Sequence, residues 1–481
     1  MSYRTVIGLE IHVELKTDSK MFCGCSTTFG SEPNSHCCPV CLGLPGSLPV
    51  VNRRALEKGI KAALALNCKV EKNSRFDRKN YFYPDLPKAY QISQYDVPLA
   101  HGGYMELCYD GGKKVSIQRC HLEEEAGKLI HAGNSIMEAN YSLVDYNRAG
   151  IPLLEIVTAP DLQSPEEAHY FLNELRLLLL YNEVSDCRME EGSLRCDANI
   201  SLSVPGTDEL GAKVEVKNLN SFKAVKAALE YEVGRQAQIL SSGGEITQET
   251  RHWDGQQKIT LFMRGKEDAS DYRYFPEPDL PPLQLENAWI EEIRKTMVET
   301  PEERRSRYRE QYGLDEGEVE ILVNHPDLCI FFEQAAGKYT NYRKLYNWSA
   351  GELLRIAHEH HLSADILEPY ILVEILQILD RGDINRGVAK EVLEEALLDG
   401  KNPSRIVEEK NLEIIGNVDA LEELVKKVLQ ENPQACLDYM EGKKKALEFL
   451  VGQIMARTRG RADPSAVRKL IEEQAHRAYY P

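Results

Sequence analysis

The sequence predicts an α+β fold, in which an antiparallel-sheet cradle domain is followed by all-helical domains. Apolar and polar residues alternate in segment after segment up to about residue 290, which is the pattern of half-buried strands. From residue 291 onward, apolar residues recur at helical spacing with short breaks. At 481 residues the chain is too long for one ordinary core. We expect a sheet-based domain over residues 1–290, a helical domain over 291–400 and a helical tail domain over 401–481.

The composition excludes several classes of protein. The formal net charge of −18 argues against nonspecific coating of nucleic acid, which needs clustered Lys and Arg. Residues 401–481 hold 14 Lys and Arg against 13 Asp and Glu, so the acidity belongs to the first 400 residues. No apolar run approaches the roughly 18 residues that cross a bilayer, so we expect no membrane partner. A patterned strand begins by Val6 and leaves no room for a signal peptide, so we expect a cytoplasmic protein.

The first predicted strand runs from Ile7 to Leu15 and carries a polar face. Side chains of a strand alternate between its two faces, so Glu10, His12 and Glu14 point away from the apolar face. Neighbouring residues on one face stand about 6.6 to 7 Å apart, so two of them can share a metal ion with residues from adjacent strands. This strand therefore predicts a metal site that further strands must complete.

Five of the twelve cysteines crowd between residues 23 and 41, and they do not read as a disulfide framework. Cys23-x-Cys25 followed by Cys38-x-x-Cys41 is close to the pattern of a tetrahedral zinc site, in which each pair supplies two thiolates. The adjacent pair His36–Cys37 leaves open which residues are the ligands, and a set of buried free thiols is the alternative interpretation. Four thiolates leave no open coordination position, so we expect a structural zinc.

A helix is expected over Arg53–Leu66, where apolar residues recur at helical spacing. The segment Phe76–Gln91 follows, in which basic, amide and aromatic residues interleave and the prolines exclude a helix. Arg78, Lys79 and the tyrosines of such a loop suit a phosphorylated or aromatic ligand. A surface loop with packed aromatic side chains explains the same residues equally well.

Later strands repeat the arrangement of the first. A strand over residues 115–122 ends in a run of three carboxylates, of which one can turn inward; we prefer Glu124, with Glu123 second. Charge runs usually form solvated faces, but carboxylates that recur on patterned strands strengthen the metal hypothesis. Glu155 lies inside an apolar strand of the stretch Asp145–Val157, where it is either exposed at an edge or buried with a partner. The carboxylates within the other strands are Asp197 (194–204) and Glu215 (212–219).

Helices are expected between and after these strands. A capping box at Ser164–Glu167 begins one helix, and a second runs from Ser221 to Leu240. Thr300–Glu303 caps the first helix of the second half, and the proline-rich segment Asp271–Asp279 is expected to be extended. The remaining helices are predicted over Ala364–Leu379, Gly387–Leu397, Ala420–Gln430, Lys445–Met455 and Pro464–Ala475.

The end of the tail domain concentrates basic side chains. A solvated helical face is one interpretation of them. Binding of structured RNA is the other, because short basic helices can track phosphates without reading bases. The residues are Lys443, Lys444, Lys445, Arg457, Arg459, Arg461, Arg468, Lys469 and Arg477.

Several of these segments resemble a single family across nearly the whole chain: the B subunits of the tRNA-dependent aspartyl/glutamyl amidotransferases. Long and chemically unusual strings in the right order make the resemblance specific. They are Val6–Thr17, Phe76–Asp85, Gly192–Asn199, Lys217–Phe222 and Asp271–Asp279, with Phe449–Met455 and Gly460–Pro464 in the tail.

The resemblance implies a reaction and its partners. The family uses ATP and magnesium to phosphorylate the side-chain carboxylate of glutamate or aspartate mischarged on tRNA(Gln) or tRNA(Asn). Ammonia then displaces the phosphate and gives Gln-tRNA(Gln) or Asn-tRNA(Asn). The ammonia comes from glutamine hydrolysed in a separate amidase (glutaminase) subunit and arrives through a tunnel, while a small third subunit ties the heterotrimer together. The resemblance thus implies a ligase component with a catalytic first domain and a tail that binds tRNA.

The family's site residues carry over one by one. Lys79 with Arg78 would be catalytic and ATP-binding, because they would stabilise charge on the transferred phosphoryl group. His12 would bind the metal, orient a carboxylate or bind ammonia. The family motif Glu-Glu-Asp stands here as Glu123–Glu125, which leaves open which of the three carboxylates reaches the metal. The implied magnesium ligands are Glu10, His12, Glu124, Glu155, Asp197 and Glu215.

Two other classes of function stay open at this point. One is a non-catalytic, zinc-containing scaffold that binds RNA, for which carboxylates such as Glu10 and Asp197 would be dispensable. The other is a freestanding metal-dependent hydrolase. The sequence contains no Ser-Lys signature or other activated nucleophile, so glutamine hydrolysis is expected to need a partner chain.

Overall fold

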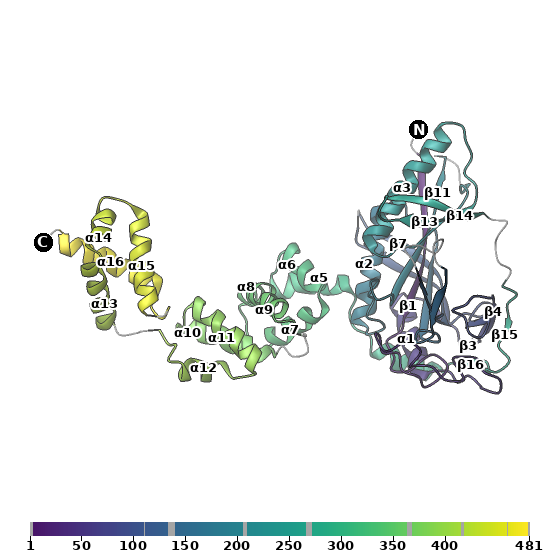
Figure 1. Cartoon of the computed structure of the whole chain (residues 1–481), viewed down its shortest axis with the longest axis horizontal. Coiled ribbons are helices and arrows are strands. Elements are labelled where there is room, and N and C mark those ends of the chain that lie inside the picture. The colour runs from purple at the N-terminus through teal and green to yellow at the C-terminus, as the bar shows by residue number, and fades with distance from the viewer. Residues whose placement is uncertain are drawn as a thin grey trace. The chain divides into compact units, whose positions relative to one another are not determined.

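The computed structural model describes residues 3–109, 111–132, 140–204, 209–265, 272–362, 368–414, 418–458 and 460–479. Two compact units, Met1–Glu303 and Arg304–Pro481, follow one another along the chain (Figure 1). The mainly antiparallel sheet of the first unit and the helices of the second confirm the predicted α+β class. The three-domain division expected from the sequence stays a prediction. In the residues that the structure describes, no helix is long and apolar enough to cross a membrane.

One large sheet is the centre of the first unit. All pairs of neighbouring strands are antiparallel except β12 (Val214–Lys217) and β13 (Glu249–Asp254), which are parallel. The strand predicted over residues 7–15 is confirmed as β1 and lies in the middle of the sheet. In the described residues the strand order is β14 (Ile259–Gly265), β13, β12, β11 (Leu194–Ser203), β1 (Arg4–Glu14), β10 (Pro152–Thr158), β7 (Lys113–Glu124), β6 (Ala100–Leu107) and β2 (Lys69–Val70).

Helices cover the apolar face of this sheet. Ile7, Leu9 and Ile11 of β1 are at most 1% exposed, and they share one hydrophobic cluster with apolar residues of α1 (Arg53–Ala65), α2 (Pro165–Tyr181) and α3 (Phe222–Ser241). Figure 1 shows α2 and α3 on one flank of the sheet and the strands β4 (Asp77–Asn80) and β15 (Phe275–Pro276) on the other. The polar face of β1 therefore looks away from the three helices.

Short strands form smaller sheets beside the large one. β4 pairs with β15 and with β5 (Tyr90–Ser93), β16 (Leu283–Gln284) pairs with β3 (Asn73–Ser74), and β8 (Lys128–His131) pairs with β9 (Ser142–Asp145). The expectation of a continuous loop over residues 76–91 is therefore wrong at its two ends. The sequence of β4 shows no alternation of apolar and polar residues, and its partner β15 lies almost two hundred residues further along the chain, so no local signal marks the pairing.

Strand β6 is not predicted from the sequence because Gly102 and Gly103 interrupt its pattern. A Cβ atom on Gly103 would lie 2.4 Å from the carbonyl oxygen of Leu66 and 2.3 Å from the sulfur of Cys68. Glycine is therefore required where the end of α1 approaches the sheet edge. Strands β13 and β14 also lack a clear pattern and complete the opposite edge.

The helices predicted in both units are confirmed where the structure describes them. Residues 364–367 of the helix expected over Ala364–Leu379 lie outside the described residues, and its described part begins at Pro369. Ser164 caps α2 by accepting a hydrogen bond from the amide of Glu167, and Ser221 caps α3 in the same way. The capping box at Thr300–Glu303 is present, with the amide of Glu303 donating to the Thr300 hydroxyl at 3.2 Å. The further helices of the described residues are α4 (Asn287–Lys295), α5 (Pro301–Tyr312), α6 (Glu316–Val323), α7 (Pro326–Ala336), α8 (Tyr342–Asn347), the π-helix η2 (Trp348–Leu353), α9 (Leu354–Glu359), α10 (Pro369–Arg381), α11 (Arg386–Asp399), α12 (Pro403–Glu409), α13 (Val418–Glu431), α14 (Pro433–Met440), α15 (Lys444–Arg457) and α16 (Pro464–Tyr479).

Candidate functional site

The register of the large sheet gathers polar residues on one face. Glu10 of β1 lies opposite Asp197 of β11, and His12 lies opposite Glu155 of β10. Residues that face each other across two strands point to the same side of the sheet. Glu215 of β12 joins them because it lies opposite Asn199, which is on the same face of β11 as Asp197. The structure therefore brings five of the predicted magnesium ligands to one face: Glu10, His12, Glu155, Asp197 and Glu215.

Two histidines and two glutamates form the centre of this face, and we call them the inner cluster. The Nε2 atom of His12 lies 3.4 Å from Glu155 Oε2 and 3.6 Å from Glu123 Oε1. The Nε2 atom of His121 lies 3.2 Å from Glu155 Oε2 and 3.8 Å from Glu123 Oε2. Glu10 borders the cluster, with its Oε1 atom 4.0 Å from His12 Nε2. His121 is not predicted as a site residue from the sequence, although His121 and Glu123 alternate on one strand and this spacing could have indicated a shared face.

The inner cluster holds buried charges of opposite sign. Burial by itself raises the pKa of Glu155, but His121 and His12 outweigh it and hold that pKa well below its usual range. Burial lowers the pKa of His121, and Glu155 and Glu123 overcome this effect and raise it to about 9. Glu10 differs from both, because burial and the nearby charge of Glu155 raise its pKa. The carboxylates and imidazoles of the inner cluster thus favour each other's charged forms.

Glu124 does not lie in this cluster. It occupies the strand position between Glu123 and Glu125, so its side chain points to the opposite face of β7. There its carboxylate accepts a hydrogen bond of 2.9 Å from the amide of Ile92 and forms an ion pair with Lys88. The preference for Glu124 over Glu123 as the carboxylate that turns toward the site is therefore corrected in favour of Glu123.

A lysine lies between two of the predicted magnesium ligands. The Nζ atom of Lys217 lies 2.5 Å from Asp197 Oδ2 and 3.1 Å from Glu215 Oε1. Glu215 also accepts a hydrogen bond of 2.8 Å from the hydroxyl of Thr250. Asp197 and Glu215 thus share the polar face but form an outer group, whose charge is already partly balanced.

Lys79 and Arg78 point to different sides of β4. Burial by itself lowers the pKa of Lys79, but the charges of Glu123 and other anionic groups, including Glu155, raise it overall. The ammonium of Lys79 therefore lies in the field of the inner cluster, and its Nζ atom is 5.0 Å from the ring centre of Tyr272. Arg78 instead donates two hydrogen bonds, of 2.6 and 2.8 Å, to the buried carboxylate of Glu277. The structure thus places only Lys79 toward the inner cluster.

The inner cluster fits a divalent cation in its choice of donors. Ligand atoms of Glu10, His12 and Glu155 lie within 4.8 Å of one another, and so do those of His121, Glu123 and Glu155. Carboxylate oxygens suit a hard cation such as magnesium, and imidazole nitrogens also accept manganese or zinc. The Nδ1 atom of buried His121 has no hydrogen-bond partner within the described residues. The donor set is therefore compatible with the magnesium that the resemblance implies.

The four predicted zinc ligands form a second cluster. The sulfur atoms of Cys23, Cys25, Cys38 and Cys41 all lie within 4.8 Å of one another, and those of Cys38 and Cys41 are 3.9 Å apart. Zinc–sulfur bonds of about 2.3 Å in a tetrahedron place the sulfur atoms about 3.8 Å apart, so the quartet can hold a structural metal ion. The alternative ligands His36 and Cys37 do not belong to the quartet, and the His36 carbonyl accepts a hydrogen bond from Lys20.

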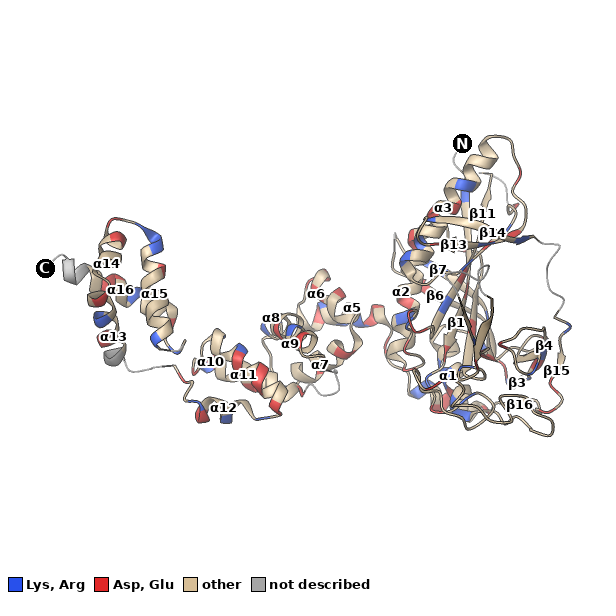
Figure 2. Cartoon of the chain, in the orientation of Figure 1, with Lys and Arg blue, Asp and Glu red and all other residues tan. Residues whose placement is uncertain are grey.

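The basic residues of the tail are mixed with acidic ones. Figure 2 shows both signs of charge on α13 to α16. Lys443 pairs with Asp438 at 2.8 Å, Arg468 pairs with Glu448 at 2.8 Å, and Arg457 pairs with Glu431. Such exposed pairs are weak and leave their cations able to meet a phosphate. Arg459 and the side chain of Arg477 lie outside the described residues, as does Asp271 of the segment Asp271–Asp279 that is expected to be extended.

Comparison with known proteins identifies the class. A model of the GatB/GatE catalytic domain matches residues 5–291, and a model described as the GatB domain matches residues 330–474. The aspartyl/glutamyl-tRNA(Asn/Gln) amidotransferase B subunit of Carboxydothermus hydrogenoformans is 54% identical over 475 residues, which is 98% of each chain. The proteins of the same name from Caldanaerobacter subterraneus and Clostridium botulinum are 52% and 47% identical over 98% and 99% of this chain, and over 99% and 100% of their own.

These matches place the chain among amidotransferases of the ligase type, since a catalytic-domain model matches residues 5–291, which make up most of the first unit. The chain belongs to the family of aspartyl/glutamyl-tRNA amidotransferase B subunits, whose domain models and relatives cover nearly its full length.

Proposed function

We propose that this chain phosphorylates the side-chain carboxylate of glutamate on tRNA(Gln), of aspartate on tRNA(Asn), or of both, with ATP, and then amidates it with ammonia. Membership of the B-subunit family supports the proposal. The observation that carries it is the inner cluster of His12, His121, Glu123 and Glu155, which faces the cation of Lys79.

The chemistry needs an activated carboxylate. A carboxylate is a poor acyl donor because its oxygen is a poor leaving group. Transfer of the γ-phosphoryl group breaks the bond to ADP and joins the phosphorus to the substrate oxygen, giving an acyl phosphate. The nitrogen of ammonia then attacks the carbonyl carbon, inorganic phosphate leaves, and the amine loses a proton to give the amide. Such a transfer depends more on electrostatics and positioning than on covalent help from the protein.

Magnesium is the proposed cofactor at the inner cluster. Glu10, His12 and Glu155 are proposed as ligands, with Glu123 in the role that the sequence assigned to Glu124. Asp197 and Glu215 are proposed as outer ligands, which requires Lys217 to move from between them. When bound, the ion supplies positive charge that offsets the charge of the ATP phosphates.

Lys79 is the residue proposed to stabilise the transferred phosphoryl group. It lies on a strand of the small sheet, and the carboxylates of the inner cluster keep it protonated. Arg78 is proposed to act indirectly, because its guanidinium is already engaged with Glu277 and lies 4.2 Å from the ring centre of Tyr90. Its contribution is to hold β4 against the segment that contains β15.

Several partners follow from the same proposal. Ammonia comes from a separate amidase (glutaminase) subunit, and a small third subunit completes a heterotrimer with this chain. The tail, with its cations at the surface of α15 and α16, binds the tRNA.

The cysteine quartet holds a structural zinc. The proposed location is the cytoplasm, which keeps thiols reduced and so suits a cysteine quartet that binds its metal as thiolates.

The test is a reconstituted conversion of mischarged tRNA. Glu-tRNA(Gln) and Asp-tRNA(Asn) are incubated with the chain, its candidate partner subunits, ATP, magnesium and ammonium, and the attached amino acid is analysed. We expect ATP-dependent formation of Gln-tRNA(Gln), Asn-tRNA(Asn) or both. Amide formation without ATP, or none with any partner present, would contradict the proposal.

The scaffold alternative makes the opposite prediction for the acidic face. If the chain only holds RNA, Glu10→Ala and Asp197→Ala leave amide formation intact in the reconstituted enzyme. If the polar face that carries the inner cluster performs phosphoryl transfer, both variants lose amide formation, with ammonium as well as with glutamine as the nitrogen source. A hydrolase of the freestanding kind would show glutaminase activity in the isolated chain, and we expect none.

A further inference from the structure

Lys20 is a fully buried lysine without a carboxylate partner. Its side chain is 0% exposed. The Nζ atom donates hydrogen bonds to the carbonyl oxygens of His36 at 2.7 Å and Tyr146 at 3.2 Å, and it lies 3.7 Å from the sulfur of Cys41. Among the described residues, no carboxylate lies within ion-pair distance of Lys20. A buried ammonium needs an anion, because carbonyl dipoles alone do not replace water around a full charge.

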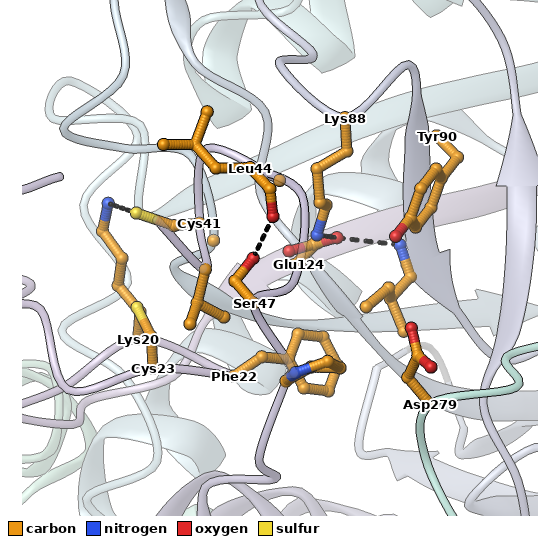
Figure 3. A pocket seen from close by; sticks show the side chains of 15 residues that line it. Lys20, Phe22, Cys23, Cys41, Leu44, Ser47, Lys88, Tyr90, Glu124 and Asp279 are labelled. Carbon is orange, nitrogen blue, oxygen red and sulfur yellow. Dashed lines mark hydrogen bonds and ion pairs between the residues drawn. The ribbon is translucent and has the colours of Figure 1, made fainter. Parts of the chain in front are cut away.

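Lys20 and a second lysine, Lys88, line the same cavity, which has a volume of about 60 Å³. Lys88 shows how a buried ammonium is usually neutralised. Its side chain is 8% exposed and forms an ion pair with the buried carboxylate of Glu124. Figure 3 shows the two lysines, with Lys88 directed at Glu124 and Lys20 directed at Cys41. The sulfur of Cys41 therefore occupies the place that a carboxylate occupies for Lys88.

We propose that Lys20 is the built-in counter-cation of the four-cysteine centre and stabilises its metal-bound form. Four thiolates and one zinc ion carry a formal net charge of about −2. The side chain of Lys20 covers part of the centre that carries this charge. An N–H···S hydrogen bond from Lys20 to Cys41 offsets this charge and holds the thiolate in the geometry of the bound state. The inference rests on the quartet holding a metal and is independent of the proposed reaction.

Lys20 also ties the quartet to the acidic face. Its own amide donates to the carbonyl of Cys25 at 3.0 Å, inside the first pair of cysteines. Its ammonium reaches the carbonyl of Tyr146, and the neighbouring amide of Met21 donates to Gly150 at 2.7 Å, two residues before β10 begins. Gly150 has a φ of +90°, and a Cβ atom there would lie 3.4 Å from Lys20 Cδ. The segment that leads into the strand of Glu155 is therefore fitted around this lysine.

The test compares two replacements of Lys20 in the zinc-loaded, full-length chain. Lys20→Met keeps an unbranched apolar stem, one atom shorter, and removes the charge, whereas Lys20→Arg keeps a cationic donor in a larger side chain. Zinc release to an excess of a colorimetric chelator is followed in each. We expect Lys20→Met to release zinc about tenfold faster or more, and Lys20→Arg to release it more slowly than Lys20→Met. Lys16→Met, which removes an exposed charge that pairs with Asp186, serves as the control and should match the unaltered chain.

Two outcomes overturn the inference. If Lys20→Met releases zinc at the unaltered rate, the charge has no role at the quartet. If Lys20→Arg releases zinc faster than Lys20→Met, Lys20 contributes by packing alone, because methionine is the better match in shape.

A measurement on the unaltered protein covers the case in which Lys20→Met fails to fold. The chain is labelled with 15N-lysine and loaded with 113Cd in place of zinc. We expect one slowly exchanging ammonium resonance that contacts the β-protons of Cys41 and loses its protection when the metal is removed. Absence of such a resonance would refute the hydrogen bond.

Discussion

The acidic face of the sheet, which is the polar face that carries the inner cluster, lies in the same unit as the four-cysteine cluster. Different interactions support the two clusters. The inner cluster stands on β7, β10 and β1, where backbone hydrogen bonds fix the register of His121, Glu155 and His12. The apolar side of these strands is packed against helices. The cysteines lie on bends and turns instead, and three of the four are only half-buried.

This difference has a consequence for the role of each metal. Donors on paired strands keep their positions whether or not a cation is bound, so a metal there serves chemistry. Donors on turns without a core depend on their metal for a fixed geometry, because the binding free energy replaces packing that the segment lacks. The two clusters should therefore respond in opposite ways when their metals are removed.

Metal removal is expected to give the largest effects. In magnesium-free buffer, amide formation from mischarged tRNA should be abolished while resistance to proteolysis stays unchanged. After zinc is stripped, cleavage between residues 26 and 37 should become about tenfold faster or more, because this segment opens locally without its metal. Limited proteolysis with mass spectrometry measures both states. Faster cleavage in magnesium-free buffer would show that the acidic face also depends on its cation for folding.

Replacement of Glu155 by glutamine is expected to have the next largest effect. Glu155→Gln removes the carboxylate that both histidines share, and kcat/KM for ATP-dependent amide formation should fall by about 10³-fold. Glu106→Gln is the control, because Glu106 is a strand carboxylate 61% exposed that pairs only with Lys114 among the described residues. The circular dichroism spectrum of both variants should match the unaltered chain. A small loss of activity in Glu155→Gln would favour the scaffold alternative.

A substitution of Glu232 measures how much a buried ion pair that binds no metal contributes to the stability of the first unit. Glu232 is 0% exposed on α3, and it accepts hydrogen bonds from Arg235, Gln236 and Thr260, at 2.5 Å from the Thr260 hydroxyl. Glu232→Gln should lower the free energy of unfolding by about 3 kcal/mol, because it removes the buried negative charge that pairs with Arg235 and leaves Glu249 to balance that arginine. Glu230→Gln on the same helix is the control, since Glu230 is 51% exposed. Urea unfolding of the isolated chain measures both variants.

The same residue predicts a dependence on pH. Burial by itself raises the pKa of Glu232, but hydrogen bonds from Arg235, Thr260 and Gln236 outweigh it and lower that pKa below 4.5. The native state thus favours the charged form, so the stabilisation is complete above the ordinary value of 4.5 and is lost as the pH falls below it. Glu232→Gln should narrow its stability gap to the unaltered chain between pH 6 and pH 3. A constant gap would show that the ionised form contributes nothing.

Substitutions of Lys79 and Arg78 are expected to have the smallest effects, one on activity and the other on stability. Lys79→Met should lower kcat by about 10²-fold with unfolding unchanged, because its cation faces the inner cluster. Arg78→Lys should lower the free energy of unfolding by about 1 to 3 kcal/mol, because lysine cannot form both hydrogen bonds to Glu277. Steady-state kinetics and urea unfolding of the two variants decide. If Arg78→Lys loses kcat with full stability, Arg78 touches the phosphates directly.

Particular residues show how far the sequence could predict this protein. The alternation of β1 and β11 placed Glu10, His12 and Asp197 on one face, and the structure confirms this arrangement. The spacing of the cysteines predicted the quartet, and only the structure separates it from the alternative ligands His36 and Cys37. The preference for Glu124 within the run Glu123–Glu125 was wrong. Periodicity alone does not give the register of a strand in its sheet, so it does not show which member of a run points inward.

What the sequence by itself determined is local: which segments alternate, which turns bring two cysteines together and which helices are capped. These properties follow from side-chain and backbone preferences over a few residues. Only the tertiary structure decided which strands are neighbours, that His121 completes the inner cluster, that Glu277 engages Arg78 and that Lys20 faces Cys41. These contacts join residues up to 199 positions apart, and they are fixed by sheet register and by the burial of charges, which no short window of sequence contains.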